Sequence, residues 1–447
     1  MLFAVSRLWM LCLSFVLDFS LFKILRRTNP RDALRHLVCF ASSWPVLVLC
    51  VRPFSNTLEA VAVAVVVALV SSDGRCSRLQ CYAVAAFAVA GLWIRVTTLA
   101  FLAPSAVYHI ARLLKARDVS LFAQSVCAIL FAASAFILLD THFYGAALHR
   151  DGTGPGFTVT PWNLFLYNSN TSNLANHGLH PRVTHAGVNM PMLLTAALPL
   201  LYHRVFVIAC NMARGRLSWL HTDALLASTV LVGIVALSVF PHQEPRFLLP
   251  LLVPSFALLS TTSWLSSRRM QYAWTVANAV LVLFWGVLHQ GALLPALFSL
   301  SADPGACSIA VAGTYSAPAT AAASCVSVGQ CSSPPVASLE GASVLEIDTF
   351  LQTALRRRCV FLVAPASHPL CVTRDCTRRT PLQPAPHPPP LLQVGCLGSR
   401  RQRLPGLRDI SVAAHLHRVR STAPRDLFRC VSFSCSHLVA FADFCPM

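Results

Sequence analysis

The chain has 447 residues, of which 55% are hydrophobic and only 12% are charged. This composition is too apolar for an ordinary soluble fold. The formal net charge of +18 would suit a nucleic-acid-binding protein. However, the basic residues occur in short clusters between apolar runs, as they do in the cytosolic loops of membrane proteins. We therefore expect a polytopic membrane protein with no nucleic-acid partner.

Apolar runs of spanning or near-spanning length follow one another along residues 1–300. A transmembrane helix needs about 20 mostly apolar residues, and the Arg and Lys clusters between alternate runs indicate their cytosolic side. The sequence thus predicts an all-α multi-span helical bundle of about nine or ten spans. The runs are Leu2–Phe22, Arg35–Val51, Ala60–Val70, Leu79–Leu102, Leu121–Leu139, Val188–Cys210, Thr222–Phe240, Phe247–Leu265 and Tyr272–Gln290.

Two polar features interrupt the first half of this bundle. The segment Arg52–Glu59 is the predicted lumenal tip of a helical hairpin. In a capping interpretation, Ser55 or Asn56 caps the following helix and Glu59 lies near its positive end. Arg95 lies within a long apolar run, where a lone arginine needs a carboxylate or a phosphate as partner.

The segment 141–186 is the longest polar stretch between the predicted helices, and we expect it to be a lumenal loop. Four of its polar residues are candidates for contacts with phosphate or with sugar hydroxyls, and a solvated loop without a site is an equal alternative. The histidines lack the regular spacing of a zinc site, so no metal is assigned. The four candidates are His177, His180, Arg182 and His185, and Asn163 is a further candidate for substrate binding.

The composition changes after residue 300. Residues 301–370 are rich in Ala, Ser, Pro and Cys, and we expect them to form a small lumenal region. Residues 371–447 are rich in Pro and Arg, a composition that buries too little apolar surface to order itself. We expect this last segment to be either a disordered tail or a tail that related proteins do not have.

The motif His242–Pro250 reads HQEPRFLLP and lies where the chain leaves and re-enters the predicted bilayer. Ionisable residues at such a place are costly unless they are paired or hydrated. In one interpretation, Glu244 and Arg246 only neutralise each other in an interfacial loop. In the other, Arg246 and His242 hold an anionic head group.

This motif resembles the HQE/HKE-x-RF-L-P signature of the dolichol-phosphate-mannose-dependent mannosyltransferases, glycosyltransferase family 22. The stretches Arg52–Glu59, Thr160–Asn189 and Phe284–Gly291 are similar to further parts of that family. The resemblance implies a GT-C-like fold and a multi-pass protein of the endoplasmic reticulum membrane. Because the family has additional sequence ahead of the segment that resembles Leu13–Asp18, it also implies that the chain lacks the amino-terminal part.

Within the family, the chain is most similar to the branch that adds the fourth mannose, in α-1,2 linkage, to glycosylphosphatidylinositol (GPI) precursors. The resemblance implies dolichol-phosphate-mannose as the donor substrate, a GPI glycolipid as the acceptor, and no cofactor. A role for Arg52 and Glu59 in the substrate-binding site depends on this resemblance.

Transfer of mannose from a β-linked lipid phosphate into an α-linkage inverts the anomeric carbon, so it needs one base and a held leaving group. Arg246, His242 and Arg95 are candidates for holding the phosphate. Asp140 resembles an acidic position of the family and is the candidate base, although a supporting role is favoured. The family's His-Pro-Asp-Glu run is not present. A catalytically inactive or truncated relative, or a lipid-phosphate-binding transporter, is therefore the alternative to an active hexosyltransferase.

Overall fold

The computed structural model describes most of the first 289 residues and five short strands after them. The described residues are 2–72, 74, 76–148, 157–170, 179–262, 264–265, 267–289 and 350, together with the strands between 308 and 434. Among the site candidates, His177 lies outside them. The chain divides into two compact units, one mainly of Ala4–Ala175 and Leu179–Trp285 and the other mainly of Gly286–Met447.

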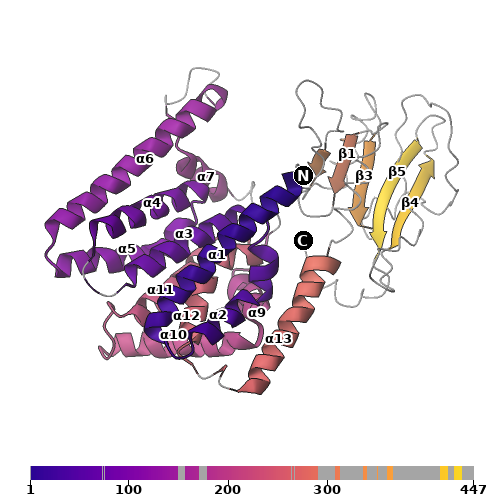
Figure 1. Ribbon diagram of the computed structural model, residues 1–447. Helices are drawn as coiled ribbons and strands as arrows, with labels where there is room; N and C mark the ends of the chain where they lie inside the picture. Colours follow the sequence, from indigo (N-terminus) through magenta and orange to yellow (C-terminus); the bar gives the residue numbers. More distant parts are fainter. Residues whose placement is uncertain are drawn as a thin grey trace. The chain divides into compact units, whose positions relative to one another are not determined.

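The first unit is helical throughout its described secondary structure (Figure 1). Its α-helices are α1 (Leu2–Thr28), α2 (Ala33–Ala41), α3 (Ser55–Val70), α4 (Arg78–Ile94), α5 (Thr98–Lys115), α6 (Val119–Leu148), α7 (Thr160–Ser169), α9 (Met190–Leu194), α10 (Leu198–Ala213), α11 (Thr222–Ser238), α12 (Leu252–Leu259) and α13 (Arg268–Leu283). Short 3-10 or π-helical segments are η1 (Pro45–Leu49), η2 (His185–Asn189), η3 (Thr195–Ala197), η4 (Pro245–Leu251) and η5 (Phe284–Leu288).

Helix α3 lies at the centre of the packing in this unit. It contacts α4, α5, α12 and η4, and nearly every residue from Ala60 to Val70 is buried. A helix that is apolar on all sides is stable when other helices surround it, and its Ala and Val side chains let neighbouring backbones approach closely. The packing therefore fixes the polar start of α3 beside η4.

The helical membrane-protein prediction is confirmed. Four described helical segments are long and apolar enough to cross a membrane, by length and composition: Ala4–Thr28, Val119–Tyr144, His185–Ala213 and Arg268–Leu288. Four further apolar helices are shorter: Ser55–Val70, Arg78–Ile94, Thr222–Ser238 and Pro245–Leu259. The described residues thus contain fewer full-length spans than the nine or ten predicted.

Several predicted spans are broken in the structure. The run Arg35–Val51 is divided between α2 and η1, where Pro45 begins a π-helical segment. The run Phe247–Leu265 is divided between η4 and α12, because Pro250 has no N–H to donate within a regular helix. The run Leu79–Leu102, which was predicted to hold Arg95 in its interior, is divided between the end of α4 and the start of α5.

Gly233 marks a close contact between α11 and its neighbours. A Cβ added at Gly233 would lie 2.8 Å from Phe101 of α5 and 2.9 Å from Leu251 of η4. Both neighbours are buried, so they have little room to move. We expect Gly233→Ala to lower the free energy of unfolding by about 1–3 kcal/mol, measured by denaturant unfolding in detergent. The control is Gly187→Ala, whose added Cβ meets nothing within 4 Å; equal losses in the two variants would contradict this prediction.

The second unit contains a five-stranded sheet, which the all-α prediction did not include. Its strands are β1 (Ser308–Ala312), β2 (Val336–Leu339), β3 (Val360–Pro365), β4 (Ala413–Arg420) and β5 (Leu427–Ser434), in the order β2-β1-β3-β5-β4. Among the described strand pairs, β4–β5 is antiparallel and the other three are parallel. Strands β4 and β5 lie in the segment expected to be disordered. The Phe and Val residues of β5 favour strands, but the Pro- and Arg-rich composition of the whole segment obscured this local signal.

Candidate functional site

The loop between α11 and η4 holds an ion-paired group. The Nε2 of His242 lies 2.9 Å from Oε1 of Glu244, and the Nη2 of Arg246 donates to the same oxygen at 2.8 Å. The Nε of Arg246 pairs with the other carboxylate oxygen of Glu244. Arg246 therefore engages Glu244 through both carboxylate oxygens, a geometry that strengthens and orients arginine–carboxylate pairs.

Arg95 has the carboxylate partner that its apolar surroundings require. It lies in extended backbone directly after α4, and its Nε is 3.1 Å from Oε2 of Glu59. Its Nη1 donates to the hydroxyl oxygen of Ser55 at 3.2 Å. Glu59 is fully buried and also accepts hydrogen bonds from the hydroxyls of Thr97 at 2.6 Å and Thr98 at 3.2 Å. The α4–α5 junction is thereby attached to the start of α3.

The capping interpretation of this segment is wrong. Phe54 occupies the cap position of α3, no side chain caps that helix end, and its first turn holds no acidic residue. Ser55 and Glu59 instead serve Arg95. The reason is that burial makes an unpaired guanidinium more costly than an uncapped helix end.

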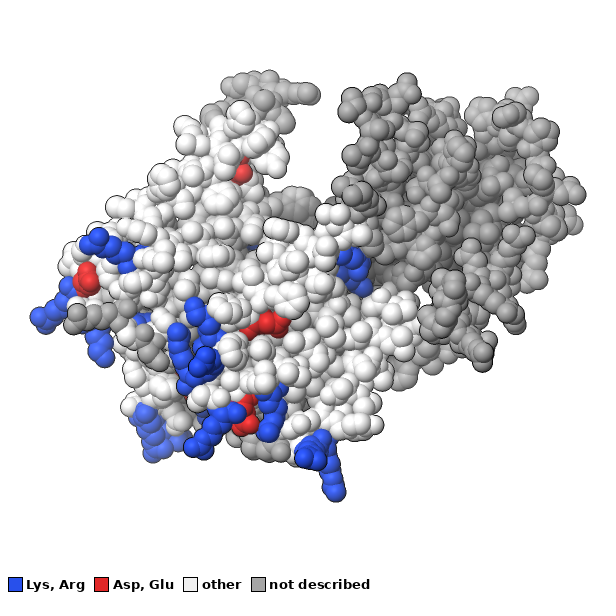
Figure 2. Space-filling model, viewed as in Figure 1, with Lys and Arg blue, Asp and Glu red and all other residues white. Residues whose placement is uncertain are grey.

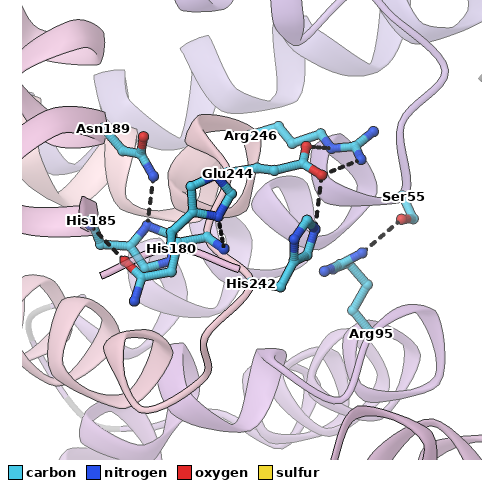
Figure 3. A network of polar contacts seen from close by, with 9 residues as sticks. Ser55, Arg95, His180, His185, Asn189, His242, Glu244 and Arg246 are labelled. Carbon is cyan, nitrogen blue, oxygen red and sulfur yellow. Dashed lines mark hydrogen bonds and ion pairs between the residues drawn. The ribbon is translucent and has the colours of Figure 1, made fainter. Parts of the chain in front are cut away.

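The ring of Phe247 joins these two groups. The guanidinium carbons of Arg95 and Arg246 lie 5.1 Å and 5.8 Å from its centroid, distances at which a cation is attracted to an aromatic ring. The His242 ring meets it edge to face at 5.3 Å. Figure 3 shows His242 and Arg95 beside the Glu244–Arg246 pair. We call this group the cationic cluster: Arg95, His242 and Arg246, with their partners Glu59, Glu244 and Phe247.

The carboxylates of the cationic cluster are more buried than the arginines. The side chains of Glu59 and Glu244 are 1% and 19% exposed, whereas those of Arg95 and Arg246 are 24% and 30% exposed. The arginines therefore keep a solvent-facing side opposite carboxylates that already hold and orient them. This arrangement suits the binding of a further anion from outside.

The surroundings of Glu244 keep its carboxylate charged. Burial alone would raise the pKa of Glu244, but the hydrogen bond with His242 and the charge of Arg246 lower it to about 2. This value lies below the ordinary pKa of about 4.3 for glutamate. The ionised carboxylate therefore stabilises the fold above about pH 4.3, and this stability is lost as the pH falls toward 2.

The titration of Glu244 should make the unfolding free energy of the wild-type chain depend on pH differently from that of Glu244→Gln. Between about pH 6 and about pH 2.5, we expect the wild-type chain to lose about 2 kcal/mol more unfolding free energy than Glu244→Gln, which cannot titrate there. The comparison is made by detergent unfolding titrations at both pH values. Parallel losses in the two proteins would show that Glu244 is not held by this ion pair.

A second set of hydrogen bonds, centred on Gln243, holds the loop between α11 and η4 in place. Gln243 is 2% exposed, and its Oε1 accepts a hydrogen bond from the backbone N–H of His185 at 2.8 Å. Its Nε2 donates to the backbone carbonyls of Arg182 at 3.2 Å and Phe240 at 3.1 Å. Figure 3 shows His180 and His185 on this side. Gln243 thus connects the segment before η2 to the loop that carries the cationic cluster.

Two predicted ligand residues, His180 and Arg182, help to hold that loop. The backbone N–H of His180 donates to the carbonyl of Pro241 at 2.7 Å, and Nη1 of Arg182 donates to the carbonyl of Val239. Burial and the neighbouring His242 lower the pKa of His180, so its ring is neutral near pH 7. The described contacts give both residues a positioning role.

The remaining predicted site residues lie elsewhere in the helical unit. The Oδ2 of Asp140 accepts hydrogen bonds from the indole N–H of Trp93 at 2.8 Å and from the backbone N–H of Thr160 at 3.2 Å. Asp140 thus attaches α6 to α4 and to the start of α7, which is a supporting arrangement. Asn163 is exposed on α7, and Nη2 of Arg52 donates to the carbonyl of Trp285 at 3.0 Å.

Comparisons with known proteins agree with the resemblance found in the sequence. The chain is 35% identical to GPI mannosyltransferase 4 of Aspergillus oryzae over 299 residues, which cover 65% of this chain and 53% of that protein. It is 35% identical to GPI mannosyltransferase 4 of Emericella nidulans over 297 residues, 64% of this chain and 50% of that protein. It is 30% identical to GPI alpha-1,2-mannosyltransferase 4 of Homo sapiens over 319 residues, 65% and 54% of the two chains.

The chain spans about half the length of the curated relatives it matches. No solved structure matches it. The Alg9-like mannosyltransferase family matches residues 1–310, a region that contains the cationic cluster and every described helix of the first unit. The chain belongs to the Alg9-like mannosyltransferase family.

Proposed function

We propose that the chain is the membrane-embedded part of a mannosyltransferase that moves mannose from dolichol-phosphate-mannose to a GPI-anchor precursor. It adds the fourth mannose, in α-1,2 linkage, at the lumenal face of the endoplasmic reticulum membrane. The observation that carries this proposal is the cationic cluster, in which Arg95 of the α4–α5 junction and Arg246 of η4 lie around the ring of Phe247. The names of the relatives, GPI mannosyltransferase 4 and GPI alpha-1,2-mannosyltransferase 4, support the acceptor and the linkage.

The cationic cluster suits the phosphate of a lipid-linked sugar. A guanidinium has five N–H donors in a fixed plane, and Glu244 engages only the Nε and Nη2 of Arg246. The other donors of that side chain can therefore bind phosphate oxygens on its exposed side. The phosphate leaves as an anion, so it needs cations and donors rather than an acid. Arg95 adds a second guanidinium at the same ring of Phe247, and His242 meets that ring edge to face.

The acceptor hydroxyl must also lose a proton to a base. The Oδ2 of Asp140 is already engaged by Trp93 and Thr160, which favours a structural role for that carboxylate. This observation supports a second candidate function, in which the chain binds a lipid phosphate without transferring mannose.

One assay distinguishes the two functions. The purified chain, reconstituted in nanodiscs, is given radiolabelled dolichol-phosphate-mannose and a GPI acceptor that carries three mannoses. The proposed function predicts a product whose added mannose is released by an α-1,2-mannosidase. Saturable donor binding without product would favour the second function. The absence of donor binding would contradict both.

A further inference from the structure

A groove outside the cationic cluster runs between α4 and α6, and its volume is about 660 Å³. Tyr82 and Ala86 line it on α4, and Ser120, Ala123, Ala128 and Ala132 line it on α6. Gln124, Cys127 and Phe131 of α6 also line it, so the lining positions recur every three or four residues and form one continuous stripe on each helix. Four of the nine lining residues are alanines, whose short side chains leave space between the two helices.

The groove has the length of one bilayer leaflet. From Ser120 to Ala132, an α-helix rises about 18 Å, and half of the bilayer hydrocarbon core is about 15 Å thick. In its most apolar stretch only 11% of α6 is buried, and Phe131, beside the groove, is 77% exposed. The groove therefore opens toward lipid chains and matches one of them in length.

One end of the groove is basic. Arg78 lies one helical turn before Tyr82 on the same face of α4, and Lys115 and Arg117 lie directly before α6; all three are exposed. Figure 2 shows Lys and Arg side chains gathered at the end of the helical unit where α5 meets α6. The carboxylate of Asp118 accepts a hydrogen bond from the backbone N–H of Leu121 at 2.9 Å, so it caps α6. Positive charge is in excess at this end.

A polar contact crosses the groove near the same end. The hydroxyl of Tyr82 donates to Oε1 of Gln124 at 3.1 Å. Tyrosines favour the boundary between head groups and hydrocarbon. Along its length the groove presents basic side chains, then a polar contact, and then an apolar channel. This is the order in which a phospholipid would present its phosphate, its polar boundary and its acyl chain.

We propose that this groove binds one acyl chain of an anionic phospholipid from the leaflet that faces the basic turns. Its phosphate lies at Arg78 and Arg117, and its chain lies along the alanines of α4 and α6. The excess positive charge favours an anionic head group over a zwitterionic one. The positive-inside pattern places this end in the cytosolic leaflet, where anionic lipids are enriched.

The test uses the full chain in nanodiscs of equimolar phosphatidylserine and phosphatidylcholine. After extraction in detergent, the retained lipid is quantified by mass spectrometry. We expect phosphatidylserine to be enriched at least about fivefold, and Arg78→Gln with Arg117→Asn to remove that enrichment, since each basic residue contributes about fivefold. Asparagine is chosen because Arg117 has a φ of +54°, a conformation that asparagine tolerates.

Two further variants separate charge from shape. Arg214→Gln with Arg216→Asn removes two exposed arginines from the turn after α10 and should leave the enrichment unchanged. Ala86→Leu with Ala123→Leu fills the groove from exposed positions and should lower the retention of both lipids. Equal retention of the two lipids by the wild-type chain, or enrichment that survives Arg78→Gln with Arg117→Asn, would overturn the proposal.

Discussion

Replacing Arg246 with glutamine should reduce mannosyl transfer from dolichol-phosphate-mannose by about 100- to 1,000-fold, the usual cost of losing one donor to a developing anion. Arg246 is the most exposed cation of the cluster, and Glu244 holds its guanidinium through both carboxylate oxygens. Its loss removes the donors best placed for the phosphate. Arg246→Lys keeps the charge but loses the planar fork, so we expect an intermediate rate.

The control for this experiment is Arg204→Gln. Arg204 forms a similar ion pair, 2.7 Å from Asp223, and its side chain is 28% exposed. It lies in α10, away from the cationic cluster in sequence and without a contact to it among the described residues. We expect Arg204→Gln to change transfer by less than about threefold, since its ion pair with Asp223 includes no residue of the cationic cluster. If Arg246→Gln were equally mild, the cationic cluster would not be the phosphate site.

The second large effect concerns folding. Arg95→Gln should lower the free energy of unfolding by about 3–5 kcal/mol, because it leaves the carboxylate of Glu59 buried without a cation. Glu59 is fully buried and has no other cation among its described partners. The double variant Glu59→Gln with Arg95→Gln removes both charges together. It should cost less than the sum of the single variants, by about 0.5–3 kcal/mol.

An exposed pair provides the comparison for this cycle. Arg35 lies 2.9 Å from Asp32, with side chains 45% and 42% exposed. Arg35→Gln should change the free energy of unfolding by about 0–1 kcal/mol. Chemical unfolding in detergent measures all the variants. Additive effects at Glu59 and Arg95 would mean that the two side chains do not form the pair that attaches the α4–α5 junction to α3.

The sequence predicted the residues of the loop better than their partners. An arginine in an apolar run requires a counter-charge, and Arg95 has one in Glu59. That partner could not be identified in advance, because it depends on how α3 packs against the α4–α5 junction. The same limit applies to Phe247, which appeared only as a letter of the motif and whose ring contacts Arg95, Arg246 and His242.

Residue type alone could not show what two polar residues contact. His180 and Arg182 stay candidates for ligand contacts, and the structure adds that the backbone N–H of His180 and the Nη1 of Arg182 donate to backbone carbonyls near the loop. Gln243, which holds the same loop, was overlooked because an uncharged side chain gives no electrostatic signal. Hydropathy likewise cannot show that a proline such as Pro250 turns part of an apolar run into 3-10 helix.

The most direct test of the proposed site is to determine on which side of the membrane α7 and the cationic cluster lie. In an Asn170→Gln background, which removes the natural Asn-Thr-Ser glycosylation sequence, single glycosylation sites are introduced beside Asn163 and beside Glu244. We expect both sites to be modified in the endoplasmic reticulum lumen, because α7 and the cationic cluster share that face of the membrane. Modification at only one of them would place α7 and the cationic cluster on opposite faces of the bilayer and contradict this expectation.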